Sequence, residues 1–129
     1  MPGRPLICVV DDDAAVRRAI VGLINSMGYR CSGHPSAKAA LDSGEAEAAA
    51  CIVTDIHMPG VDGFALKQLL DDRGCCAGVI MMTARGEEHL ERRAFEAGAL
   101  CFMRKPLHAE TLAKCLAQAL ALNRGPSGT

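Results

Sequence analysis

Residues 6–13, LICVVDDD, join a continuous apolar run to three consecutive aspartates. The run is short and partly β-branched, which is typical of a strand that is buried on both faces. Apolar residues then recur at helical spacing from Ala14 to Met27, and Gly28 is a natural stop for that helix. The stretch therefore predicts a buried strand that ends at acidic residues and is followed by an amphipathic helix.

The same alternation continues to the end of the chain. Further strands are expected at residues 29–33, 50–53, 78–82 and 99–103, and further helices start near Ser36, Asp62, Glu87 and His108. Five strand–helix repeats predict an α/β fold, with a parallel sheet and helices on both of its faces. We expect residues 1–122 to form one domain and residues 123–129 to be a tail or the start of a linker.

Composition excludes several classes of protein. Half of the 129 residues are hydrophobic and 22% are charged, which is typical of a globular domain. The formal net charge of −1 gives no support for nucleic-acid binding by this segment, and no apolar run approaches the length of a membrane span. The seven cysteines are odd in number and lack zinc-site spacing, so we expect free thiols and a cytoplasmic location.

Polar residues follow the apolar strands at their carboxyl ends. Asp11 and Asp12 end the first strand, Asp55 the third and Thr83 the fourth, and Lys105 lies just after the fifth. Because parallel strands place these ends at one edge of the sheet, we expect the five side chains to gather there. Taken singly, each of these residues could simply mark the point where a strand stops.

The charges of this group favour a bound metal ion. Three carboxylates held together repel one another unless a cation compensates them, and oxygen ligands suit a hard divalent ion such as Mg²⁺ or Mn²⁺. A carboxylate can act as a nucleophile toward a phosphoryl group and form an aspartyl phosphate, a reaction that depends mainly on positioning and charge stabilisation. The pattern therefore indicates phosphoryl chemistry at a partly hydrated metal site.

Four motifs resemble the receiver domains of bacterial two-component response regulators. They are VVDDD at residues 9–13, VTDIHMPGVDG at 53–63, MMTA at 81–84 and MRKP at 103–106. The likeness extends over residues 6–122, and its details are similar to FixJ-like receivers. The resemblance implies a doubly wound, flavodoxin-like (βα)5 fold of the CheY type, with five parallel strands in the order 2-1-3-4-5.

The resemblance also implies which residues bind the metal and the phosphate. Asp55 would accept the phosphoryl group. Asp11 and Asp12 would bind Mg²⁺ together with Asp55 and the backbone carbonyl of His57. Lys105 would bind a phosphate oxygen.

Further residues are implied to transmit or tune the signal. Thr83 would move toward the phosphate and Phe102 would turn inward with it, which changes the face made of the fourth helix, the fifth strand and the fifth helix. His57 and Arg85 would tune the lifetime of the phosphate. Pro106 would follow a cis peptide bond, which proline makes feasible.

The implied partners follow from the same resemblance. A sensor histidine kinase would supply the phosphoryl group, a DNA-binding output domain would follow outside this chain, and phosphorylation would favour a homodimer. The domain would be a signalling module and not an enzyme, apart from its own phosphorylation and dephosphorylation.

Three other functions are compatible with parts of the pattern. A phosphatase of the haloacid dehalogenase type would place a second aspartate where His57 stands, and a flavodoxin-like carrier would need a hydroxyl- and glycine-rich first loop where Asp11 stands. An inert receiver that only binds proteins would retain the fold.

Outside the site, we expect Asp13 to be a helix cap or surface charge, and His34, His89 and His108 to be surface residues.

Overall fold

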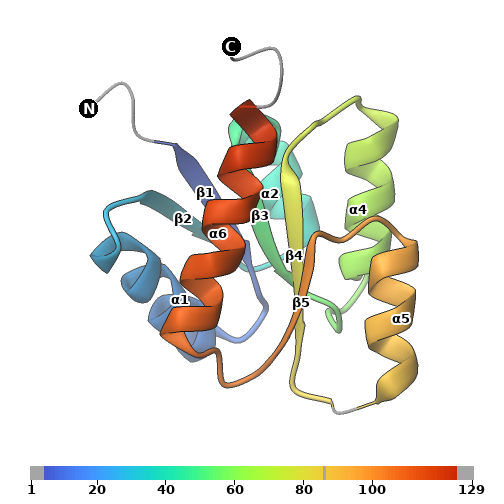
Figure 1. Cartoon of the computed structure of the whole chain (residues 1–129). Coiled ribbons are helices and arrows are strands. Elements are labelled where there is room, and N and C mark those ends of the chain that lie inside the picture. Colours follow the sequence, from blue (N-terminus) through green and yellow to red (C-terminus); the bar gives the residue numbers. More distant parts are fainter. Residues whose placement is uncertain (1–4, 86, 125–129) are drawn as a thin grey trace.

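The computed structural model describes residues 5–85 and 87–124 as a five-stranded parallel sheet with helices on both faces (Figure 1). The strands are β1 (Leu6–Val10), β2 (Arg30–His34), β3 (Cys51–Asp55), β4 (Gly78–Thr83) and β5 (Cys101–Arg104). The helices are α1 (Ala14–Ser26), α2 (Ala37–Ser43), α3 (Glu45–Ala48), α4 (Gly63–Asp72), α5 (Glu88–Glu96) and α6 (Ala109–Arg124). The strand order β2-β1-β3-β4-β5 confirms the predicted fold class.

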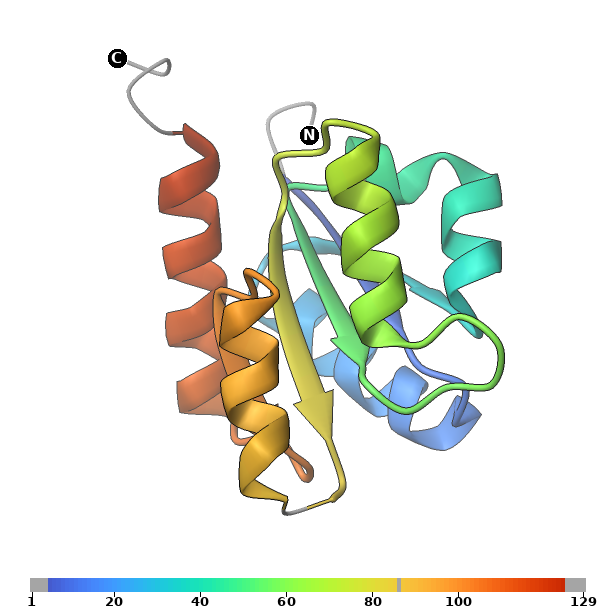
Figure 2. The same cartoon turned by 90° about the vertical axis from the view of Figure 1, so that its right-hand side faces the viewer.

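Two hydrophobic cores lie on opposite faces of the sheet, because successive strand residues point to alternate sides. Helices α1 and α6 cover one face, where Ile24 and Leu116 pack on residues of the strands such as Val53. Helices α2 to α5 cover the other face, where Leu66 and Leu90 contribute to the second core (Figures 1 and 2). Burial on both faces explains why β1 and β3 are continuous apolar runs.

The helices begin at side chains that cap their first backbone N–H groups. Asp13 accepts hydrogen bonds from the N–H groups of Ala15 and Val16, which confirms it as a helix cap. Ser36 and Asp62 cap α2 and α4 in the same way. These caps fix where each helix starts relative to the strand before it.

The second expected helix is α2, and a short additional helix, α3, follows it in the stretch up to Ala49 that the sequence left between helix and loop. Gly44 adopts a left-handed conformation with φ of 78°, which ends α2 and starts the short α3. The prediction of five helices was therefore wrong by one, and the expected fourth and fifth helices are α5 and α6. Helix α6 also continues to Arg124, whereas residues 125–129 of the expected tail lie outside the described residues.

The cysteines behave as small hydrophobic residues. Cys8, Cys51, Cys101 and Cys115 are buried, and all seven cysteines are free thiols, as predicted. Among the helices of residues 5–85 and 87–124, none is both long and apolar enough to cross a membrane.

Candidate functional site

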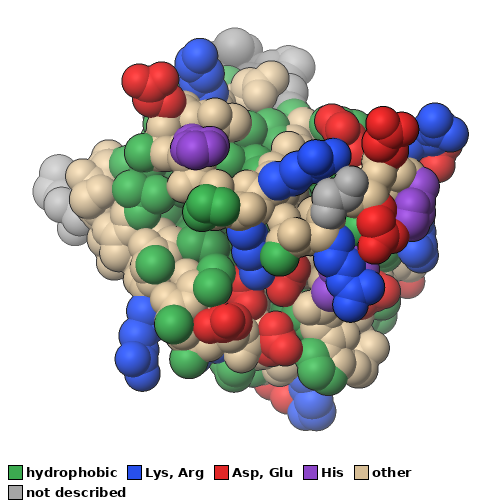
Figure 3. Space-filling view, turned by 90° about the horizontal axis from the view of Figure 1, so that it is seen from below, with side chains coloured by type: hydrophobic (Ala, Val, Ile, Leu, Met, Phe, Trp, Pro, Cys, Tyr) green, Lys and Arg blue, Asp and Glu red, His purple; other side chains and the backbone are tan. Residues whose placement is uncertain are grey.

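The predicted acidic residues meet at the carboxyl edge of the sheet. Asp11 follows β1 and Asp55 ends β3, and one carboxylate oxygen from each of Asp11, Asp12 and Asp55 lies within 4.8 Å of the others. Asp11 is fully buried and Asp55 is 6% exposed, whereas Asp12 is exposed. Figure 3 views this end of the molecule and shows acidic and basic side chains in contact near the middle of the face.

Lys105 joins the two buried carboxylates. Its Nζ lies 2.7 Å from Asp11 Oδ2 and 3.3 Å from Asp55 Oδ2. The backbone N–H of Lys105 donates to the Thr83 carbonyl at 2.8 Å, so the end of β5 is tied to the end of β4. The Lys105–Pro106 peptide bond is cis. The ammonium group is thereby held between two negative charges that come from different strands.

Backbone and side-chain donors orient the two aspartates. The Asp11 carboxylate accepts from the Asp13 N–H at 2.9 Å, and the Asp55 carboxylate accepts from the His57 N–H at 3.4 Å. Arg17 donates from Nη1 to the Asp11 carbonyl at 2.8 Å, so α1 also anchors this turn. No motif pointed to Arg17, because its contact depends on how α1 packs beside β1.

The ionisation of Asp55 and Lys105 reflects their burial and their mutual charges. Burial raises the pKa of the Asp55 carboxyl; the nearby Lys105 opposes this rise, and the Asp11 charge adds to it. Burial acts to lower the pKa of Lys105, but the hydrogen bond that Lys105 donates to Asp11 and the charge of Asp55 outweigh this effect and raise that pKa. The site thus favours a charged lysine and makes a charged Asp55 costly.

Because holding a charged Asp55 in this buried position costs free energy, we predict that Asp55→Asn stabilises the metal-free protein at neutral pH. Because the folded-state pKa of Asp55 is raised, its contribution to stability is greatest below the unfolded pKa and is lost as pH rises through the folded value. We expect the variant to gain about 1 kcal/mol at about pH 7 and little at about pH 4, measured by urea unfolding in a chelator. Asp72→Asn, on the exposed end of α4, is the matched control. An equal gain at both pH values would contradict this explanation.

The remaining predicted site residues lie around the cluster. Thr83 is fully buried at the end of β4, and its Oγ1 accepts from the N–H of the exposed Arg85 at 3.0 Å. Phe102 on β5 is half-buried and packs against the core beneath α2 to α5. The His57 ring nitrogen Nε2 is enclosed and has no hydrogen-bond partner among the described residues. The structure therefore brings Asp11, Asp55 and Lys105 into direct contact, adds Asp12 to the group of carboxylates and puts Thr83 at the end of the neighbouring strand β4.

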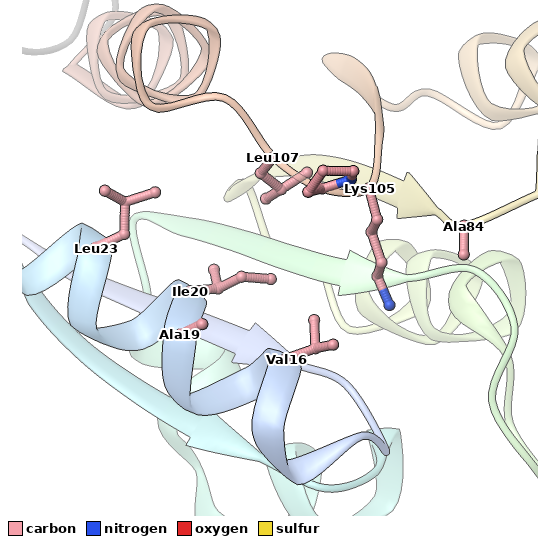
Figure 4. Close-up of a pocket in the computed structure, with 8 residues that line it drawn as sticks. Val16, Ala19, Ile20, Leu23, Ala84, Lys105 and Leu107 are labelled. Atoms are coloured by element: carbon pink, nitrogen blue, oxygen red, sulfur yellow. The ribbon is translucent and has the colours of Figure 1, made fainter.

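An apolar groove of about 430 Å³ borders the cluster. Figure 4 shows side chains of α1 facing Leu107 and the stem of Lys105 across this groove. Val16, Ile20 and Leu23 contribute its α1 side. The acidic edge of the sheet is therefore flanked by an open apolar surface, with Lys105 at the boundary.

His34 was wrongly predicted to be a surface residue. It is 8% exposed, and its Nε2 lies 3.1 Å from Glu45 Oε1 and 3.4 Å from Ser32 Oγ. Its carbonyl accepts from the Asp11 N–H at 3.1 Å, which supports the turn after β1. The expected strand stopped at residue 33, so the sequence pattern did not place His34 at this edge, whereas β2 in the structure ends at His34.

The donor set fits a hard divalent cation. Asp11, Asp12 and Asp55 offer carboxylate oxygens within 4.8 Å of one another, and they are the only group of potential metal ligands of this size found in residues 5–85 and 87–124. Oxygen-only ligands that leave room for water match the preference of Mg²⁺. A cation there would also relieve the repulsion between the Asp11 and Asp55 charges.

Comparison with known proteins agrees with this geometry. The family model of the response regulator receiver domain matches residues 7–117. The chain is 42% identical over 106 residues to the transcriptional regulatory protein FixJ of Azorhizobium caulinodans, covering 82% of this chain and 50% of that protein. It is 36% identical over 118 residues to the regulatory protein TdiR of Thauera aromatica, covering 92% and 52%. The chain thus spans about half the length of these relatives.

Solved structures show the same fold. The crystal structure of FixJ-N superposes with a TM-score of 0.83 at 26% identity, covering 91% of this chain and 94% of that chain. A receiver domain from Clostridium thermocellum superposes with a TM-score of 0.86 at 22% identity, covering 93% and 97%. Taken with the acidic cluster at the carboxyl edge of a 2-1-3-4-5 sheet, these matches show that the chain belongs to the receiver domains of two-component response regulators, which act in phosphorelay signalling and not as enzymes.

Proposed function

We propose that Asp55 accepts a phosphoryl group from a sensor histidine kinase, in a reaction that requires Mg²⁺ or Mn²⁺ bound at Asp11, Asp12 and Asp55. The observation that carries this proposal is the contact of Lys105 with the carboxylates of both Asp11 and Asp55. A cation and an ammonium group on either side of one carboxylate are suited to balance the charge of an incoming phosphoryl group.

Each residue has a definite part in the proposed transfer. An Asp55 oxygen forms a bond to phosphorus while the bond from phosphorus to the donor nitrogen or oxygen breaks, and the donor leaves with the electron pair. Lys105 shifts from Asp55 to a phosphate oxygen while Asp11 keeps its charge compensated. The bound cation, held also by the His57 carbonyl, would supply positive charge toward the phosphoryl oxygens. The enclosed position of Asp11 limits competing solvation of these charges.

The test is the intact mass of the protein after incubation with acetyl phosphate. We expect one phosphate adduct that requires Mg²⁺ and is absent in Asp55→Asn. If no adduct forms in a folded, Mg²⁺-containing sample, the domain is an inert binding module. If the donor is consumed without an adduct, a phosphatase-like activity is indicated, although His57 stands where a haloacid dehalogenase would carry its second aspartate.

Thr83 and Phe102 are proposed to carry the signal to the surface. The Thr83 hydroxyl now accepts a hydrogen bond from the Arg85 N–H at 3.0 Å. After phosphorylation it would give up this bond and donate to a phosphate oxygen. Phe102 lies beside Met81 in the register of β4 and β5, so a shift of the β4 end changes the space next to its ring. The face of α5, β5 and α6 would then report phosphorylation.

His57 and Arg85 are proposed to tune how long the phosphate persists. Both flank the acceptor region, since His57 donates its N–H to Asp55 and Arg85 donates its N–H to Thr83. We expect His57→Ala and Arg85→Ala each to change the rate of phosphate loss several-fold, because a side chain next to the acceptor changes how easily water can reach the phosphorus. The decay of purified phosphoprotein measures this rate, with the exposed Lys38→Ala as control. A wild-type rate of phosphate loss in both variants would contradict this proposal.

A phosphorylation-dependent homodimer is proposed to use the face of α5, β5 and α6. Phe95 on α5 is 48% exposed, and Arg92 and Arg104 lie with it around a shallow polar depression. Burying such an aromatic side chain commonly dominates an interface, so Phe95→Asp should weaken the dimer by about 2 kcal/mol or more without affecting phosphorylation. Sedimentation of the phosphorylated protein measures this, with Arg18→Asp on α1 as control. A wild-type phosphoprotein that stays monomeric would contradict the proposal.

The wider assembly is also a proposal. Because the chain spans about half of FixJ and TdiR, a DNA-binding output domain after a linker that starts near residue 123 is expected in the whole protein. Residues 1–122 would be the receiver domain, without nucleic-acid or membrane contacts of their own. Phosphorylation by an ATP-dependent kinase would take place in the cytoplasm. Analysis of DNA binding by the whole protein, before and after phosphorylation, tests this arrangement.

A further inference from the structure

Cys76 differs from the six other cysteines in its exposure. Cys8, Cys51, Cys101 and Cys115 are buried, Cys31 and Cys75 are half-buried, and Cys76 is exposed. A thiol can react only if an oxidant reaches it, so the exposed Cys76 is the cysteine that we expect to be oxidised first. No other cysteine offers its sulfur to solvent in this way, and all seven lie within the described residues.

Burial makes several of the other thiols less reactive. Burial raises the pKa of Cys31 to about 12, and burial together with the neighbouring Cys115 raises that of Cys101 to about 12. Burial also raises the pKa of Cys8. Because the thiolate is the nucleophile, these enclosed sulfurs remain protonated and slow at neutral pH.

Cys75 directly precedes Cys76 in the chain and carries a second thiol. The two residues lie in the connection between α4 and β4, which has no helical or strand structure from residue 75 to residue 77 and follows the left-handed Gly74, with φ of 72°. Cys75 Sγ lies 3.9 Å from the Ala46 carbonyl oxygen, and Cys76 Sγ lies 3.7 Å from the Gly74 carbonyl oxygen. Each sulfur makes a weak contact to a backbone oxygen, and Cys75 also packs against the core beneath α2 to α5.

We propose that Cys76 and Cys75 form a reversible thiol-oxidation site of this domain. A hydroperoxide oxidises the Cys76 thiolate to a sulfenic acid, as the peroxide O–O bond breaks and its other oxygen leaves as hydroxide or an alkoxide. The Cys75 sulfur then attacks the Cys76 sulfur, the S–O bond breaks, and water leaves with the Cys75 proton. The product is a disulfide between neighbouring residues, and a thiol reductant returns both thiols.

Chain geometry makes this disulfide easy to reduce. Neighbouring Cα atoms are about 3.8 Å apart, below the roughly 4.4–6.8 Å that disulfides prefer, so the bond forms only with local backbone adjustment. A strained, exposed disulfide belongs to the labile class and not to the structural one. Forming it also draws Cys75 away from Ala46, while Arg73 still holds α3 through its 2.7 Å contact with Glu47.

The oxidation site is remote from the phosphorylation site. Cys76 precedes β4, whose first residue Gly78 pairs with Cys51 at the start of β3, whereas Asp55 ends β3. Figure 2 shows the α4–β4 connection at the opposite end of the sheet from the tips of β3 and β4. Oxidation therefore does not depend on phosphorylation, and an Asp55→Asn variant should be oxidised at the same rate.

The test is mapping of thiols after brief treatment of the reduced protein with hydrogen peroxide. In the wild type, the peptide that contains both residues should become lighter by two hydrogen atoms and recover with dithiothreitol, while the other five cysteines remain open to alkylation after unfolding. Cys75→Ser should leave a Cys76 sulfenic acid that dimedone traps. Cys76→Ser should abolish oxidation of Cys75 under the same conditions, and circular dichroism checks that both variants are folded.

Cys31→Ser is the matched control and should form the disulfide normally. Three results would overturn the proposal: earlier oxidation of any other cysteine, a covalent dimer through Cys76 in the wild type, or unchanged oxidation of Cys75 in the folded Cys76→Ser variant. Slower oxidation of Asp55→Asn would overturn the independence of the two sites.

Discussion

Replacing Lys105 with methionine is expected to slow phosphorylation of Asp55 by acetyl phosphate by about 100-fold or more, the usual effect of removing one charge-stabilising donor from a reacting group. Methionine keeps an unbranched apolar stem in the groove beside α1 but lacks the ammonium group that contacts Asp11 and Asp55. The rate of adduct formation, followed by intact mass at saturating Mg²⁺, measures the effect. Lys38→Met removes an exposed lysine and is the matched control.

The same variant should lose stability in the absence of metal. Asp11 is fully buried, and without Lys105 its carboxylate faces Asp55 and loses its ion-pair partner. Breaking a buried ion pair in this way costs about 3 kcal/mol, and the loss should shrink at low pH as Asp55, whose pKa is raised, becomes protonated. Mg²⁺ should restore much of the stability but not the phosphorylation rate. A folded variant with a wild-type rate would exclude Lys105 from the reaction.

Gly63→Ala is expected to destabilise the protein by about 2 kcal/mol, because it forces an atom into the backbone that carries Asp55. A Cβ at Gly63 would lie 2.7 Å from the Asp55 carbonyl oxygen and 3.0 Å from the Ile56 Cα. Both are backbone atoms, so α4 must move away from the end of β3. The Gly63 N–H bond to the Ile56 carbonyl, now 3.0 Å, would lengthen as a result. Urea unfolding measures the loss, and phosphorylation should slow in parallel.

Gly22→Ala is the matched control for this substitution. Gly22 lies within α1, and apart from the backbone of the helix itself and its chain neighbours, a Cβ there would meet no atom within 4 Å. Alanine is a better helix former than glycine, so this variant should gain about 1 kcal/mol. Equal effects of the two substitutions would show that helix propensity, and not the close approach to Asp55, decides stability at Gly63.

The sequence predicted the sheet well because a buried parallel sheet leaves a strong signal. Strands such as β1 and β3 are apolar on both faces, and polar residues mark the edge where they end. Since parallel strands share that edge, the gathering of Asp11, Asp55 and Lys105 follows from the order of strands and polar residues along the chain. The roles within the cluster came from the resemblance to receiver domains.

Other features depend on packing that a linear pattern does not encode. The Ala-rich stretch of residues 45–50 gave no sign that Gly44 would adopt a left-handed conformation and that the short helix α3 would follow it. The burial of His34 depends on Glu45, which reaches it only because α3 folds back over the end of β2. Likewise, the contact of Arg17 with the Asp11 carbonyl follows from the angle of α1 against β1.

The central claim is that Asp55 itself carries the phosphoryl group. The most direct measurement is reduction of the phosphorylated protein with borohydride, which converts an aspartyl phosphate to homoserine, followed by peptide mapping. We predict homoserine at residue 55 and at neither Asp11 nor Asp12, only when Mg²⁺ and the phosphodonor are both present. Homoserine at another aspartate, or a phosphate adduct that borohydride leaves unchanged, would contradict the account.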